Sequence, residues 1–191
     1  MIAIRAPRPL SSRTKMRTSA VVTFRTQRGL LLTLRPAATG DLRGLAGFLE
    51  GLSAETLFLR YLAPIPRLDS EAARQEVRRL MDGSPADHPV AIVLDRAQQV
   101  VAVGELVRDA GDPAIAEVAL VVADAYQRDG IGRALFADLL KLGLQRGIKT
   151  LRGVALTENL AVRRLFGSSG LRYTTTFGSG TIEFEAALDA A

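Results

Sequence analysis

The 191-residue sequence has no cysteine and a single histidine, His88. Without cysteine there is no disulfide, no thiolate metal ligand and no cysteine nucleophile, and one histidine leaves little material for a histidine-based metal site. No apolar run approaches the roughly eighteen residues that a membrane-spanning helix needs. We therefore expect a soluble, cytoplasmic protein that uses no metal and no membrane.

Acidic residues are missing from the first 40 positions, which hold eight of the 25 Arg and Lys residues. The net charge of +5 therefore belongs to the N-terminal segment, and we predict no nucleic-acid partner. Residues 1–20, rich in Arg and Ser, are expected to be a disordered basic tail, with an organelle transit peptide or an anionic-surface anchor as alternatives. Residues 21–191 are expected to form one domain with a substantial core.

Apolar spacing and turn residues predict a mixed α/β order. A hairpin (21–26 and 30–36) precedes three helices, for which Thr39, Ser53 and Ser70 are the expected N-caps. An antiparallel meander, a long helix and a strand follow, and then a short helix and two closing strands. This order predicts a largely antiparallel sheet flanked by helices, not a doubly wound nucleotide fold. The later ranges are 90–94, 99–108 and 114–122 for the meander, 130–146 for the long helix, then 150–156, 158–166, 171–177 and 181–188.

Residues 127–133, Gln-Arg-Asp-Gly-Ile-Gly-Arg, join a strand directly to the long helix. Such a turn points free N–H groups and the positive end of the helix dipole at one spot, which suits a phosphate. Gly130 and Gly132 let the backbone approach closely, and Arg128 and Arg133 can add charge-assisted contacts. The spacing matches neither the P-loop nor the three-glycine dinucleotide motif. Turn geometry alone is the other interpretation of the two glycines.

The pattern Gln127-x-x-Gly130-x-Gly132 resembles the acyl-CoA pyrophosphate loop of the GNAT superfamily of N-acyltransferases, over roughly residues 31–188. Three stretches, LTLRPAATGDL, LSAETLFLRYL and AEVALVVADAYQRDGIG, look like the bacterial protein lysine acetyltransferases that modify acyl-CoA synthetases. The resemblance implies a GNAT fold, with a mixed, largely antiparallel central sheet, and acetyl-CoA as the acyl donor.

The resemblance also implies how acetyl-CoA is held. Residues 120–122 would pair through their backbone with the pantetheine arm, and the amides of the turn would hold the pyrophosphate. Asn159 would contact the cofactor, with a plain helix cap as the alternative. The implied cofactor-binding residues are Leu120, Val121, Val122, Gln127, Arg128, Asp129, Gly130, Ile131, Gly132, Arg133 and Asn159.

Glu117 interrupts an apolar strand ten residues before Gln127, where the resembling lysine acetyltransferases carry a general-base glutamate. An ionised carboxylate in apolar surroundings is costly unless it has a partner or a task. We predict that Glu117 takes a proton from an incoming lysine, which is otherwise protonated at neutral pH, and that a backbone N–H near Val121 stabilises the oxyanion. An ion pair with an arginine of a neighbouring element is the alternative role, and Glu105 is the reserve base.

Phe166 stands where many GNAT enzymes place a tyrosine general acid, so the leaving thiolate is expected to be protonated by water, Tyr126 or His88. The predicted reaction is acetyl transfer from acetyl-CoA to a primary amine, foremost a protein lysine, with an acyl-CoA synthetase as one candidate acceptor. Two alternatives stay open, a small-molecule amine or antibiotic N-acetyltransferase and a non-catalytic acyl-CoA-binding module. The sequence does not decide between a monomer and a homodimer.

Overall fold

The computed structural model describes residues 21–188, so the predicted basic tail at 1–20 lies outside the described residues. The strands are β1 (Val22–Arg25), β2 (Leu31–Pro36), β3 (Val90–Leu94), β4 (Val100–Arg108), β5 (Ile115–Val122), β6 (Thr150–Leu156), β7 (Tyr173–Gly178) and β8 (Thr181–Ala187). The helices are α1 (Leu42–Glu50), α2 (Ala54–Tyr61), α3 (Ser70–Met81), α4 (Ile131–Gln145) and α5 (Leu160–Gly167).

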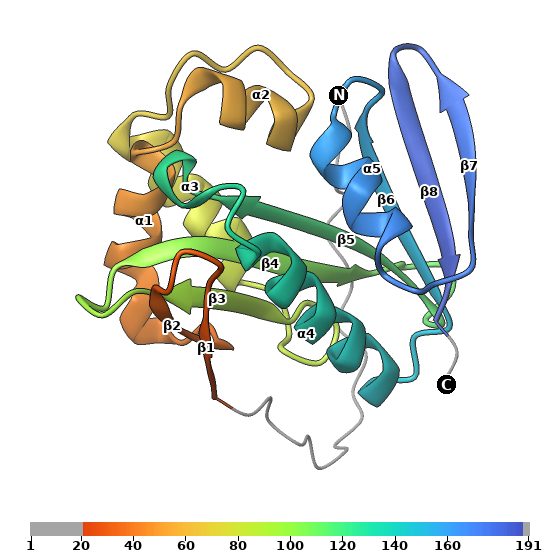
Figure 1. Ribbon diagram of the computed structural model, residues 1–191, viewed down its shortest axis with the longest axis horizontal. Coiled ribbons are helices and arrows are strands. Elements are labelled where there is room, and N and C mark those ends of the chain that lie inside the picture. The colour runs from red at the N-terminus through yellow and green to blue at the C-terminus, as the bar shows by residue number, and fades with distance from the viewer. Residues whose placement is uncertain (1–20, 189–191) are drawn as a thin grey trace.

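One eight-stranded sheet forms the middle layer, in the order β1-β2-β3-β4-β5-β6-β8-β7. Among the described strands only β5 and β6 pair in parallel; every other neighbouring pair is antiparallel. The predicted hairpin, meander and closing strands are therefore confirmed. Helix α4 lies on one face of the sheet and α1 and α3 lie on the other, so each face has its own apolar core (Figure 1). No helix among residues 21–188 is long and apolar enough to cross a membrane.

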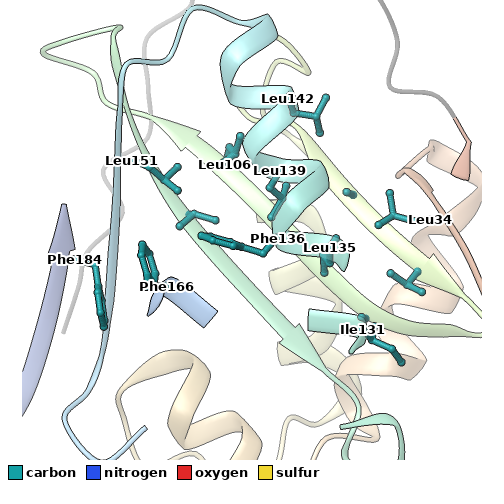
Figure 2. Close-up of a cluster of buried hydrophobic side chains, with 14 of the residues drawn as sticks. Leu34, Leu106, Ile131, Leu135, Phe136, Leu139, Leu142, Leu151, Phe166 and Phe184 are labelled. Carbon is teal, nitrogen blue, oxygen red and sulfur yellow. The ribbon is translucent and has the colours of Figure 1, made fainter. Parts of the chain in front are cut away.

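Helix α4 covers β4 and β5 with an apolar stripe (Figure 2). Ile131, Leu135 and Leu139 are at most 1% exposed, as their spacing of four residues predicts. Leu144, by contrast, is 38% exposed, because it lies on the solvent side of the last turn. The buried stripe fixes α4 on the sheet, and with it the turn at its N-terminus.

Helix caps were predicted less well than helices. Ser53 caps α2 as expected and accepts a hydrogen bond from the Thr56 N–H. Helix α3, however, is capped by Asp69 rather than Ser70, since the Asp69 carboxylate accepts from two N–H groups of the first turn and complements the helix dipole. Thr39 makes no cap hydrogen bond either; it begins a 3₁₀ turn that precedes α1.

Strands β5 and β6 separate beyond Glu117. Strand β5 pairs with β4 from Ala116 to Val122, whereas its pairing with β6 stops at Glu117. Figure 1 shows the two strands starting together and then diverging. The second half of β5 therefore has one edge that no other strand of the described chain covers.

Candidate active site

Backbone alternation along β5 decides which residues face this open edge. The N–H of Ala123 donates to the carbonyl of Val101 on β4, so odd-numbered residues of β5 direct their backbone groups toward β4. Val118, Leu120 and Val122 direct theirs toward the open edge. The register thus favours Leu120 and Val122 over Val121 as backbone partners for an extended ligand, and Val121 instead contributes a buried side chain to the core below α1 and α3.

The turn that joins β5 to α4 presents a run of free N–H groups. The first helical hydrogen bond of α4 runs from Ala134 N–H to the Gly130 carbonyl, at 3.1 Å. Within residues 21–188, none of the N–H groups of residues 128–133 has a hydrogen-bond partner. Arg128 and Gly130 both have left-handed backbone, at φ +57° and +81°, and glycine is the residue that adopts this conformation without strain. This concave set of donors fits an anion such as a pyrophosphate.

Gln127 ties this turn to α2. Its side-chain amide donates to Thr56 Oγ1 at 2.9 Å and to the carbonyl of Val122 at 3.0 Å. The hydroxyls of Thr56 and Ser53 both donate to Asp124, at 2.8 and 2.5 Å. No local pattern predicts this contact set, although the spacing of the N-cap Ser53 and Thr56 places both on one side of α2.

Asp129 points away from the anion-binding side of the turn. Its side chain is fully buried; Oδ1 accepts from the Arg28 backbone N–H at 2.8 Å, and Oδ2 forms an ion pair with Arg28 Nε at 3.0 Å. Burial opposes ionisation, but hydrogen bonds from Thr26 and Arg28 outweigh it, and the pKa of Asp129 lies below its ordinary value. The β1–β2 hairpin thus holds the turn from behind, and the carboxylate itself is directed away from a ligand.

Replacing Asp129 by Ala is expected to raise the KM for acetyl-CoA roughly tenfold and to change kcat less than about twofold, because the lost charge-assisted hydrogen bonds leave the turn less ordered. Steady-state kinetics with varied acetyl-CoA measures both constants. Asp82→Ala, at an exposed aspartate after α3, is the matched control and should leave both unchanged. An unaltered KM in a folded Asp129→Ala protein would show that the hairpin does not position the turn.

Asn159 is 8% exposed and caps α5, where its Oδ1 accepts from the Val162 N–H at 3.2 Å. This is the helix-cap role that the sequence left open. The amide nitrogen of the same side chain has no hydrogen-bond partner within residues 21–188, so contact with a cofactor stays a prediction for Asn159.

Glu117 lies on β5 at the point where β6 departs. Its side chain shares a face with Ala119 and Val121, as predicted, and is half-buried. Burial raises the pKa of Glu117, the charge of Glu105 raises it further, and Arg60 and Arg79 partly offset both. Within the described residues Glu117 makes no hydrogen bond or ion pair, so the predicted alternative of a structural pair with an arginine is not what the structure shows. An unpaired carboxylate with a raised pKa has the properties of a general base.

Glu105, the reserve candidate for the base, is instead the carboxylate that forms ion pairs. It is 1% exposed, not solvent-facing, and binds Arg60, Arg79 and His88. Burial opposes its ionisation, but the His88 hydrogen bond and the two arginines outweigh burial and hold the pKa of Glu105 far below its ordinary range. So weak a base cannot take a proton from an ammonium group effectively.

Replacing Glu117 by Gln is expected to raise the melting temperature at pH 7. The raised pKa means that the folded state binds the proton more tightly than the unfolded chain does, so ionised Glu117 destabilises the fold at pH values above its ordinary pKa. Below that range the carboxyl is protonated in both states, and the gain should vanish. Thermal denaturation at pH 7 and at about pH 4 tests this. An equal gain at both pH values would mean that ionisation is not its cause.

Tyr126 and His88, the two side chains predicted as possible donors to the leaving thiolate, both make other hydrogen bonds, and Phe166, which stands where a tyrosine is expected, is buried. Phe166 is 2% exposed and stacks on Phe184, and a Cβ on Gly153 would meet its ring at 3.2 Å, so it is a core residue. The Tyr126 hydroxyl donates to Asp95 at 3.0 Å. His88 Nε2 lies 2.6 Å from Glu105 Oε2. Solvent remains as the proton donor to a leaving thiolate.

Known proteins are similar to this chain in sequence and in fold. Acetyltransferase Pat from Mycolicibacterium smegmatis is 32% identical over 139 residues, which are 72% of this chain and 40% of that protein. The chain thus spans well under half of that relative. The crystal structure of the GNAT domain of S. lividans PAT has a TM-score of 0.77 and 25% identity, covering 87% of this chain and 96% of that one. The structure of yncA from Salmonella typhimurium with its cofactor acetyl-CoA has a TM-score of 0.61 and 20% identity, covering 84% and 95%.

Family membership rests on the sequence itself. Residues 55–171, which run from α2 to just before β7, match the acetyltransferase (GNAT) family. This match confirms the predicted GNAT fold and the predicted acyltransferase class. The chain belongs to the acetyltransferase (GNAT) family.

Proposed function

We propose that this protein transfers the acetyl group of acetyl-CoA to the side-chain amine of a protein lysine, with Glu117 as the general base. The observation that carries the proposal is the placement of Glu117: an unpaired, half-buried carboxylate where the open edge of β5 begins. The free N–H groups of residues 128–133 lie at the other end of the same strand. One extended ligand, with its anionic end at the turn and its thioester near Glu117, meets both features.

Each step of the proposed acetyl transfer is assigned to a particular chemical group. Acetyl-CoA supplies a thioester carbonyl that a neutral amine can attack. Glu117 removes a proton from the lysine ammonium, directly or through one water, since a lysine near its ordinary pKa of about 10.4 is almost fully protonated at neutral pH. An open-edge N–H, of Val118 or Leu120 rather than Val121, donates to the carbonyl oxygen as the C–N bond forms. The attacking nitrogen then loses its second proton to solvent, the C–S bond breaks as the carbonyl re-forms, and solvent protonates the thiolate.

The surface beside Glu117 favours a protein acceptor over a small amine. The cavity that Ala119 and Glu105 line does not include Glu117, and its volume is about 10 Å³. A small-molecule site needs several hundred Å³ to enclose its ligand. On the strands next to Glu117, in contrast, the face of the sheet opposite α5 is open to solvent. Arg152 on β6 and Glu183 and Glu185 on β8 are exposed there. An exposed, partly acidic face suits a lysine presented on a basic protein surface.

The test is a CoA-release assay with three acceptor classes: an acyl-CoA synthetase, polyamines and aminoglycosides. Acetylation of a synthetase lysine, located by mass spectrometry, is the expected result. Turnover with polyamines or aminoglycosides alone would replace the proposal by the small-molecule alternative. Calorimetric binding of acetyl-CoA without CoA release for any amine would indicate a non-catalytic binding module, and absence of binding would contradict the proposed cofactor site.

A further inference from the structure

Four elements meet at one buried carboxylate that the reaction does not use. Arg79 of α3 binds both oxygens of Glu105, with Nη2–Oε1 at 2.8 Å and Nη1–Oε2 at 3.0 Å. Arg60 of α2 also binds Oε1, and His88, just before β3, lies 2.6 Å from Oε2. Glu76 pairs with Arg79, at 2.7 Å and 2.8 Å, and also shares a hydrogen bond with the hydroxyl of Tyr61. Glu105 is thus the shared anion of two guanidinium groups and one imidazole.

The cluster formed by Glu105, Arg60, Arg79 and His88 adjoins Glu117. In the β4–β5 register Glu105 faces Ala119 and Val107 faces Glu117, so the two carboxylates are diagonal neighbours on one face of the sheet. Arg60 from α2 and Arg79 from α3 act electrostatically on Glu117. From the other side, Arg152 of β6 is in register with Glu117 but pairs with Glu185 of β8 at 2.9 Å. Three arginines therefore surround Glu117, and each has another acidic partner.

We propose that Glu105 is a positioning residue that binds Arg60 and Arg79 and thereby keeps Glu117 free of an ion pair. This inference rests on the proposed role of Glu117 as the base. Without the charge of Glu105, Glu117 is the nearest acid on the same sheet face that has no partner, and a guanidinium within about 4–6 Å lowers a carboxyl pKa by roughly 1–3 units. A paired Glu117 would be a weaker base and would no longer be accessible to the lysine.

Opposite changes in the cluster should shift the pH profile in opposite directions. In Glu105→Gln, the acid limb of kcat/KM is expected to move down by about one pH unit, and the plateau to fall roughly tenfold. In Arg60→Met, which leaves Glu105 paired with Arg79 and His88, the limb should move up by about half a unit. The double variant should recover most of the lost plateau, since one of the released guanidinium groups is gone. General loosening of the fold would give neither the opposed shifts nor the rescue.

The full chain is measured over a range of pH, with circular dichroism and acetyl-CoA calorimetry to show that each variant is folded and binds the donor. Glu71→Gln is the matched control: this exposed glutamate of α3 pairs with Arg74 and Arg78, far from β5, and should not alter the profile. A folded Glu105→Gln protein with an unmoved acid limb would overturn the inference. So would a double variant less active than either single one.

Failure of the proposed function is recognised separately, through Glu117→Gln. If that variant keeps full turnover, Glu117 is not the base and the proposed function fails at its mechanism. If it loses turnover while Glu105→Gln has a wild-type profile, the base assignment stands and only the positioning role is wrong. Should Glu105→Gln not fold, the upward shift in Arg60→Met alone decides, and an unshifted limb there contradicts the inference.

Discussion

Glu117→Gln is expected to lower kcat by about 100-fold or more while leaving the affinity for acetyl-CoA within about twofold. The amide has nearly the same shape but cannot accept a proton, and removal of a general base typically costs two to four orders of magnitude. Affinity should be retained because the proposed contacts to the donor are backbone N–H groups of the turn and of the open β5 edge. A loss confined to kcat separates a chemical role from a binding role.

The measurement combines CoA release at saturating acetyl-CoA with calorimetry of donor binding. Glu71→Gln, the same exchange at an exposed site, should retain wild-type turnover. The acid limb of the pH profile should also disappear in Glu117→Gln, because the group that titrates is gone. Turnover within a fewfold of wild type would remove Glu117 from the mechanism.

Leu139→Ala is expected to lower the free energy of unfolding by about 2–5 kcal/mol. Leu139 is 0% exposed in the centre of the α4 stripe and faces Gly104 of β4, where a Cβ would stand 2.8 Å from its Cδ1 (Figure 2). Gly104 has no side chain to fill that space, so truncation leaves a cavity. For a domain stabilised by roughly 5–15 kcal/mol, this is a large share of the total.

Urea denaturation followed by circular dichroism measures the change, with an unaltered m-value as the sign that the folded state is otherwise intact. Leu144→Ala on the same helix is the control; at 38% exposure its loss should cost less than about 1 kcal/mol. Equal costs at the two positions would mean that α4 does not pack as described, which would also undermine the placement of the turn at its N-terminus.

The pattern of residues close together in the sequence was enough to predict the helices and strands and one part of the site, the turn at 127–133. The period of α4 depends on neighbours three and four residues apart, and the two-residue alternation of β5 placed Glu117 and Val121 on one face. The turn at 127–133 was recognisable because its glycines stand between a strand and a helix, although a 3₁₀ turn (Asp124–Tyr126) separates it from β5. Errors at this level were small, such as the cap of α3 at Asp69, where two adjacent residues could both serve.

The partners of the charged residues followed from no local pattern. From sequence, Glu117 and Glu105 are both acids within apolar strands, with Glu117 as the predicted base and Glu105 as the reserve, and the ion pair was expected, if anywhere, at Glu117. Their roles separate because α2 and α3 dock on the sheet with Arg60 and Arg79 over Glu105, 45 and 26 residues away in the chain. Docking also turns Asp129 inward to Arg28, 101 residues distant.

By itself, then, the sequence determined which segments form strands and helices, the glycine turn and the pair of candidate acids, since all of these depend on residues close together in the chain. Only the tertiary structure decided which acid is neutralised and which edge of β5 is open. The reason is physical: burial and ion pairing raise or lower a carboxyl pKa according to what lies within a few ångströms, and here those neighbours come from α2, α3 and β4.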